Sequence, residues 1–148
     1  MDTSAPNVAV SSALATEEVE KKGLQPPKQT GIIPRGVDFI FEQIDYLRRY
    51  GWDYQVSVSF QEIYMDQIRD LLRDVVVMNG EASVVTVGSR EEVGPLLERA
   101  KLNRKVAETN CNEHSSRSHS IFQVRLVGRN AGTKQEVRGT LNLIDLAG

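Results

Sequence analysis

The feature that most constrains the fold of this chain is the alternation of apolar and polar side chains along residues 54–64. A period of two places every second side chain on the same face, which predicts a half-buried β-strand. Apolar residues recur at helical spacing on either side of it, from Val37 to Leu47 and from Val93 to Ala100. Strands interleaved with two amphipathic helices predict an α/β protein built in layers.

Local signals predict where the two helices begin and end. Pro34 suits the first turn of the first helix, where a missing N–H group costs nothing, and Gly51 stands where a C-terminal cap belongs. Ser89 and Glu92 match a capping box that opens the second helix. We expect order to begin at Gly31 and interpret residues 1–30, rich in small and charged residues, as a disordered leader.

Shorter elements join the alternating strand to the second helix. Ile68, Leu71 and Leu72 have the spacing of one apolar face of a short helical turn. Residues 75–77 and 84–87 are valine-rich runs on either side of an Asn-Gly pair. Because Asn-Gly favours a two-residue hairpin turn, we expect these two runs to form a pair of short strands.

Two strands close the chain and carry its most distinctive polar residues. Residues 120–127 and 140–144 are rich in β-branched and apolar side chains, and residues 128–133 between them form turns readily. Eight consecutive polar residues, 112–119, directly precede the first of these strands. The second strand ends in Asp145, followed three residues later by Gly148. In phosphate-binding α/β proteins such an aspartate holds magnesium, and such a glycine brings its N–H group against a phosphate.

Composition excludes several classes of function. The chain has 148 residues, 40% hydrophobic and 26% charged, with a formal net charge of −2, which argues against a large nucleic-acid-binding face. No apolar run approaches the length of a membrane helix. The single cysteine, Cys111, indicates a reducing compartment, and His114 and His119 lack a third metal ligand, so we interpret them as structural. The cluster of Lys101, Arg104 and Lys105 predicts a solvated helix face.

Residues 112–119 resemble the switch I motif of kinesin motor domains, and residues 145–148 resemble the start of their switch II. The resemblance extends over Gly-Ile-Ile-Pro-Arg, Phe-Gln-Glu-Ile-Tyr, Ile-Arg-Asp-Leu-Leu and Asn-Arg-Lys-Val-Ala-Glu-Thr, at residues 31–35, 60–64, 68–72 and 103–109. It covers essentially residues 31–148. Residues 51–54, 128–130 and 141–143 are most similar to the minus-end-directed class, whose motors are C-terminal.

The resemblance implies roles for four residues of the polar segment. Asn112 matches the asparagine that faces the γ-phosphate and the attacking water, and Ser115 matches the serine whose carbonyl helps to hold that water. Ser116 matches the serine whose hydroxyl ligates magnesium when the loop closes over ATP. Arg117 matches the arginine that closes the site through a salt bridge to a switch II glutamate.

The resemblance also implies roles at the second segment. Asp145 matches the acid that holds magnesium through water, and Gly148 matches the glycine whose N–H group senses the γ-phosphate. The implied cofactors are therefore Mg²⁺ and ATP. The implied activity is microtubule-stimulated ATP hydrolysis coupled to movement, in the cytoplasm and on the cytoskeleton. Tubulin is the implied partner, with no role for nucleic acid or membrane.

The sequence departs from the family pattern in ways that limit this activity. The 148 residues contain no G-x-x-x-x-G-K-[ST] phosphate loop. We therefore expect residues 31–148 to be the central part of a three-layer kinesin-type α/β motor fold, from switch I to the start of switch II, without the phosphate loop and the C-terminal half. We expect this part to bind ATP weakly alone and to self-associate through an exposed sheet edge. The alternative is a nucleotide-dead structural or interaction module derived from a kinesin.

Overall fold

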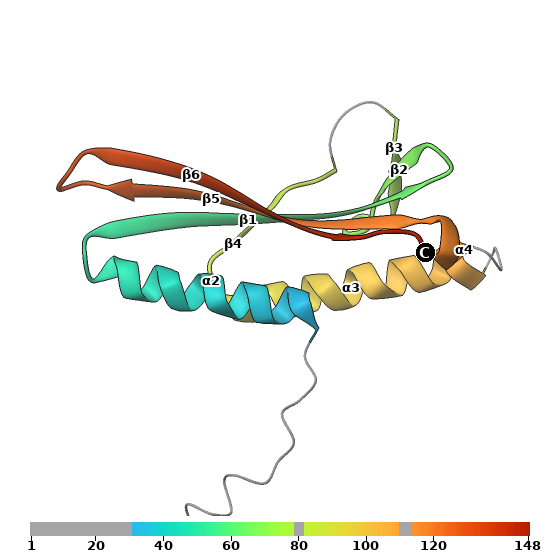
Figure 1. The fold of residues 1–148 in the computed structure, drawn as a ribbon, viewed down its shortest axis with the longest axis horizontal. Helices are drawn as coiled ribbons and strands as arrows, with labels where there is room; N and C mark the ends of the chain where they lie inside the picture. The colour runs from blue at the N-terminus through green and yellow to red at the C-terminus, as the bar shows by residue number, and fades with distance from the viewer. Residues whose placement is uncertain (1–30, 79–81, 110–113) are drawn as a thin grey trace, which may run out of the picture. The chain divides into compact units, whose positions relative to one another are not determined.

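The computed structural model describes residues 31–78, 82–109 and 114–148. Within them, helices α2 and α3 lie on the same face of a single β-sheet (Figure 1). The leader expected at residues 1–30 lies outside the described residues, and so do Asn79, Gly80 and Cys111. No helix in the described ranges is long and apolar enough to cross a membrane.

The elements follow one another along the chain with short connections. In order they are α2 (Ile32–Arg48), β1 (Trp52–Tyr64), β2 (Gln67–Asp70), β3 (Val75–Val77), β4 (Val85–Val87), α3 (Arg90–Thr109), α4 (His114–Arg117), β5 (His119–Asn130) and β6 (Gln135–Asp145). Both amphipathic helices and all three long strands occur where the sequence predicts them. Pro95 is the sixth residue of α3, so the proline removes one hydrogen bond of the second turn.

The sheet is organised around β1. Its strand order is β3-β2-β1-β5-β6, and β4 also pairs with β1. One edge of β1 pairs with β5 along nearly its whole length, from Trp52 opposite Asn130 to Ile63 opposite His119. The other edge pairs with β4 near one end and with β2 near the other. All of these pairings are antiparallel, and β1, β5 and β6 lie side by side.

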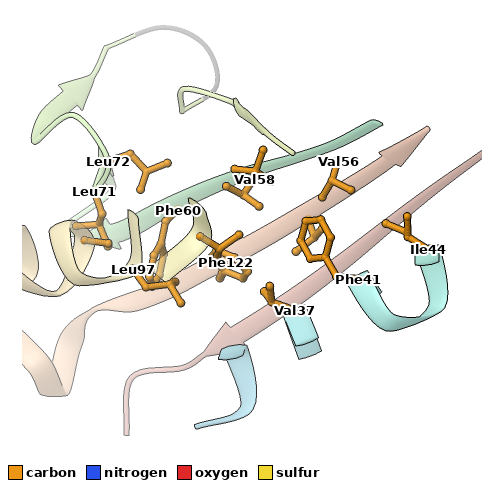
Figure 2. Close-up of a cluster of buried hydrophobic side chains, with 14 residues drawn as sticks. Val37, Phe41, Ile44, Val56, Val58, Phe60, Leu71, Leu72, Leu97 and Phe122 are labelled. Carbon is orange, nitrogen blue, oxygen red and sulfur yellow. The ribbon is translucent and has the colours of Figure 1, made fainter. Parts of the chain in front are cut away.

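The hydrophobic core lies between the sheet and the two helices (Figure 2). Its buried members come from the inward faces of β1, β5, α2 and α3: Val37, Phe41, Ile44, Val56, Val58, Phe60, Val93, Leu97, Ala100, Phe122 and Val124. Phe60 and Phe122 meet edge to face at the centre, with ring centroids 5.5 Å apart. The described residues therefore supply two layers of an α/β fold, which agrees with a partial three-layer architecture.

Two local expectations between β1 and α3 are wrong. Residues 67–70 form strand β2 instead of a helical turn, because Met65 and Asp66 both adopt positive φ and reverse the chain directly against β1. Leu71 and Leu72 are buried in the turn that follows, where Asp70 accepts a hydrogen bond from the backbone N–H of Leu72 at 2.9 Å. Leu71 and Leu72 are buried and Ile68 is half-buried, so these apolar residues do face the core although their backbone is not helical.

The second error concerns the expected hairpin of the two short strands. Strands β3 and β4 exist, but β3 pairs with β2 and β4 pairs with β1, so they are not partners of each other. Each of the two strands pairs with a strand that has another partner in the sheet. Backbone N–H and C=O groups are better satisfied in such a sheet than in an isolated two-stranded hairpin.

The closing hairpin is longer than the sequence predicts. Its turn spans residues 131–134, where the Asn130 side chain accepts hydrogen bonds from the N–H groups of Gly132 and Thr133. Gly128 belongs to β5 and not to the turn. A Cβ atom at Gly128 would lie 2.4 Å from the ring of Tyr54 on β1, so this glycine is required for close packing between strands.

Candidate functional site

The two polar segments singled out in the sequence lie together at one end of the sheet. The β5–β6 ladder places Ser120, just after the first segment, opposite Asp145, where the second segment begins. Figure 1 shows the C-terminal end of the chain beside α4 and the end of α3. This juxtaposition follows from the hairpin, because antiparallel pairing brings the start of β5 to the end of β6.

A hydrogen bond joins the two segments beyond the last ladder pair. The backbone N–H of Ala147 donates to Nδ1 of His119 at 2.9 Å. His119 is half-buried at the start of β5. The histidine is therefore structural, as expected, and its structural role lies within the candidate site.

A buried ion pair lies under the same end of the sheet. The side chain of Glu62 on β1 has no exposed surface, and the Arg104 guanidinium of α3 lies 3.5 Å from it, measured from Nε to Oε1. Arg104 also reaches Asp145, with Nη1 3.7 Å from Oδ2. Arg104 is only 25% exposed, so the expectation that Lys101, Arg104 and Lys105 form one solvated face is wrong for Arg104. Its position on α3 continues the buried stripe and points the guanidinium inward.

The structure locates four of the six predicted site residues in full and a fifth, Ser115, in its backbone only. Ser116 and Arg117 are exposed on α4, and the Asp145 side chain is 74% exposed at the end of β6. Gly148 has open space around it, with no atom within 4 Å of where a Cβ would stand. Ser115 contributes backbone to α4, while its side chain and the whole of Asn112 lie outside the described residues.

A pocket of about 430 Å³ opens beside Asp145. It lies between the first turn of α2, the middle of α3 and the paired ends of β5 and β6. Lys101, Arg104, Ser120 and Asp145 contribute its polar lining, and Phe60 and Leu97 are among its apolar wall. The pocket therefore combines two cations with an accessible carboxylate.

The donor set at this end of the sheet fits magnesium. Mg²⁺ prefers hard oxygen ligands, keeps several waters and is bound in nucleotide sites by one or two protein oxygens together with phosphates. The carboxylate of Asp145 and the hydroxyl-bearing Ser116 are both exposed and are such donors. Within the described ranges, no group of three or more His, Cys, Asp or Glu side chains could hold a metal ion without further ligands.

Comparison with protein families gives the class of this chain. The family model for the kinesin motor domain matches residues 19–148. The chain therefore belongs to the kinesin motor domain family. The matched region begins at residue 19, before the Gly31 boundary expected from the sequence.

The chain is similar in sequence to several curated kinesins. It is 43% identical to kinesin-like protein KIN-14N of Oryza sativa subsp. japonica over 81% of the chain, and 40% identical to kinesin-related protein 2 of Dictyostelium discoideum over 84%. The chain spans 18% and 19% of the length of these two relatives.

Solved structures agree with the sequence relatives. The chain is 43% identical to the motor domain of kinesin-like protein Kar3 from Saccharomyces cerevisiae, with a TM-score of 0.67 over 80% of this chain and 40% of that one. A fast kinesin gives a TM-score of 0.73 at 37% identity, covering 85% of this chain and 39% of that one. A C-terminal motor domain of Kar3 from Candida glabrata also matches, which confirms the expected similarity to C-terminal motors.

Glu62, Arg104 and His119 are the residues of this site whose roles sequence reasoning missed. A signal for the ion pair was present. Glu62 continues the alternation that buries Val56, Val58 and Phe60, so it occupies a core position. Arg104 follows Ala100 by four residues on the buried stripe of α3. A carboxylate and a guanidinium that both interrupt apolar stripes are candidates for a buried pair.

Proposed function

We propose that this chain is part of a microtubule motor that couples ATP hydrolysis to movement. The observation that carries the proposal is the junction of the polar segment with the Asp-x-x-Gly end of β6, in a chain 43% identical to the Kar3 motor domain. Related solved structures are described in terms of the kinesin motor ATPase and interactions with microtubules. The chain covers less than half of those structures, so the motor activity belongs to a larger assembly of elements than residues 31–148 provide.

In this proposal each site residue acts on the bound nucleotide or the attacking water. Ser116 and Asp145 would hold Mg²⁺, Asp145 through water, and the N–H group of Gly148 would contact the γ-phosphate. Asn112 and Ser115 would position the water that attacks the phosphate, and Arg117 would close the site. Mg²⁺, when bound, would supply positive charge against the charge that phosphoryl transfer spreads over the phosphate oxygens. The residues of this chain would position the phosphate and the attacking water for the reaction.

The 148 residues by themselves are proposed to bind Mg-ATP weakly. No sequence within them matches the glycine-rich loop whose N–H groups and lysine cradle the β- and γ-phosphates. Titration of the purified chain with a fluorescent ATP analogue, with and without Mg²⁺, measures this. We expect no saturable magnesium-dependent binding, and micromolar affinity would contradict the expectation.

A chimeric motor tests the proposed function. Residues 31–148 replace the matching segment of the Kar3 motor domain, which then supplies the elements outside the matched region. We expect microtubule-stimulated ATP turnover, and we expect Arg117→Ala to abolish the stimulation while nucleotide affinity stays near that of the parent chimera. Arg49→Ala, an exposed arginine at the end of α2, is the matched control and should leave turnover unchanged.

The chimera also discriminates between the two candidate functions. If the parent chimera folds and binds nucleotide through the Kar3 elements but shows no microtubule-stimulated turnover, residues 31–148 lack the proposed part in hydrolysis, and the structural or interaction module derived from a kinesin becomes the better description. Equal loss of binding and turnover in Arg117→Ala would contradict the proposed role of the polar segment. For the complete protein we propose a place in the cytoplasm, on microtubules, with tubulin as partner.

A further inference from the structure

We propose that His119 is a positioning residue that fixes the backbone of the Asp-x-x-Gly segment, residues 145–148, through its neutral imidazole. The inference rests on the proposed function, because it concerns how the same site keeps the Gly148 N–H group in place. It adds a residue to which the resemblance assigned no part in that site.

The ladder alone leaves the segment unsupported. The last pair between β5 and β6 is Ser120 with Asp145, so Leu146, Ala147 and Gly148 lie past the final paired residue. Beyond that pair, the backbone N–H of Ala147 donates a hydrogen bond to His119 Nδ1 at 2.9 Å. His119 is itself held, because it pairs with Ile63 on the central strand β1. The imidazole therefore links the sheet to residues 146–148, which have no strand partner among the described residues.

The geometry defines the state of the ring. An imidazole nitrogen that accepts a hydrogen bond carries no proton, so His119 must be neutral with its proton on Nε2. The acceptor also orients the Leu146–Ala147 peptide, one residue before the glycine whose N–H group we assign to the γ-phosphate. Misplacement of such a group by about 1 Å can lower a rate by about a hundredfold.

Arg104 performs a different task on the same segment. Its guanidinium lies 3.7 Å from the Asp145 carboxylate and therefore acts on a side chain at the end of the ladder. His119 acts on the main chain two residues further along. The two contacts come from α3 and β5, so the segment is held from two separate elements, and the His119 contact is the one made to the main chain.

Amide hydrogen exchange of the 148-residue chain at neutral pH tests the proposal without any nucleotide. We expect His119→Ala to speed exchange of the Ala147 amide about tenfold, as for loss of one hydrogen bond. Leu143, which pairs with Phe122 inside the ladder, is the internal control and should exchange at an unchanged rate. Unchanged exchange at Ala147 in this variant, with Leu143 also unchanged, overturns the proposal.

Two polar variants separate the hydrogen bond from general packing. The Asn side chain carries its oxygen on Cγ, where His carries Nδ1, whereas Gln carries its oxygen one atom further out. We therefore expect His119→Asn to retain most of the Ala147 protection and His119→Gln to lose it. Loss of protection at Leu143 would show that His119→Ala unfolds the chain. In that case the test is the exchange rate of the Ala147 amide in His119→Asn against that in His119→Gln. Equal rates in these two variants overturn the proposal.

Spectroscopy of the unmodified chain gives an independent result. ¹⁵N chemical shifts should show an unprotonated Nδ1 and a protonated Nε2 for His119, and the opposite tautomer overturns the proposal. These measurements do not depend on the proposed motor function, which is tested separately by ATP turnover of the parent chimera. Within an active chimera, we expect His119→Ala to lower kcat at least tenfold, His119→Asn to restore most of it, and the KM for ATP to change less than threefold. An unchanged kcat in His119→Ala would contradict the prediction that His119 supports ATP turnover by positioning residues 145–148.

Discussion

Glu62 is the single residue whose position most requires a physical explanation. A fully buried carboxylate costs several kcal/mol in lost hydration unless a cation and hydrogen-bond donors replace the water. Arg104 supplies a guanidinium 3.5 Å away, and its own side chain is mostly covered. The arginine also contacts Asp145, so a core ion pair and a proposed magnesium-binding carboxylate share one cation. The stability of the core and the electrostatics of the site are therefore coupled.

Replacing Arg104 by Leu should destabilise the chain strongly. The variant leaves the buried Glu62 charge without this cation, and breaking such a pair typically lowers the free energy of unfolding by about 3 kcal/mol. Urea denaturation at concentrations where the chain is monomeric measures the change. The double variant with Glu62→Gln should recover much of the loss, because the buried charge is gone. Lys101→Leu, at an exposed ion pair on the same helix, is the control and should change stability by less than about 1 kcal/mol.

A second single-residue prediction concerns pH and the tip of the closing hairpin. The guanidinium groups of Arg129 and Arg138 each donate to the Glu136 carboxylate at 2.9 Å, and they hold the pKa of Glu136 below its usual 4.5. A lowered pKa in the folded state means that the carboxylate stabilises the fold above pH 4.5 and that this contribution fades as pH falls through the folded pKa. The Tm difference between the parent chain and Glu136→Gln should therefore shrink on going from neutral to acidic pH. A difference that grows on acidification would contradict this assignment.

At the scale of elements, the β1–β2 connection contains local strain. Tyr64 pairs with Gln67, so Met65 and Asp66 form a two-residue loop, and both have positive φ, at 49° and 60°. This is the geometry of a type I′ turn, which favours Asn and Gly. A methionine with positive φ is unfavourable because its Cβ crowds the backbone. The register of β2 on β1 is therefore maintained by the sheet against the preference of one turn residue.

Replacing Met65 by Asn should stabilise the chain. Asn tolerates positive φ better, and the Met65 side chain is 74% exposed, so little packing is lost. We expect the free energy of unfolding to rise by up to about 1 kcal/mol, measured by urea denaturation. Met65→Ala is the matched control, because it shortens the exposed side chain but keeps a Cβ at the strained position. An equal gain in the alanine variant would attribute the effect to loss of the exposed methionine and not to the turn.

At the scale of the whole molecule, the described sheet ends in an unpaired edge. Strand β6 pairs with β5 alone among the described strands, and residues 140–144 carry no charge or proline. Ile144 is 56% exposed beside this edge. The sheet face opposite the helices is mixed along β5 and β6: Gln123 donates to Asn142 at 2.8 Å, and the neighbouring cross-strand pair is Ile121 with Ile144. The unpaired edge, with the exposed Ile144 on it, is the feature that we expect to favour association with other chains.

We predict that the isolated chain self-associates through β6. Thr140→Lys places a charge at the middle of the edge and should shift the chain toward monomer, because a charged edge resists pairing with a second copy. Gln43→Lys, an exposed position on α2, is the control for the added charge and should leave association unchanged. Sedimentation velocity over a range of concentrations measures both. Monomeric behaviour of the parent chain at all concentrations would contradict the prediction.

Sequence patterns were sufficient for the elements that bury one continuous face. Helical periodicity placed α2 and α3 and a period of two placed β1, since such spacing decides which side chains share a face, while β-branched and apolar composition placed β5 and β6. The sequence analysis singled out the polar segment and Asp145 separately, and the antiparallel pairing of β5 with β6 is what brings them to one end of the sheet. The magnesium and phosphate roles of Ser116, Asp145 and Gly148 remain proposals.

The tertiary structure alone decided which short strands pair and which charges meet. Nothing local in the sequence distinguishes β3 pairing with β2 from β3 pairing with β4, because the choice depends on strands already fixed elsewhere in the sheet. Likewise, Glu62, Arg104 and Asp145 come from β1, α3 and β6, and their contacts depend on how those elements pack. Periodicity determines the face of a residue, whereas the partner across that face is determined by packing between segments distant in the chain.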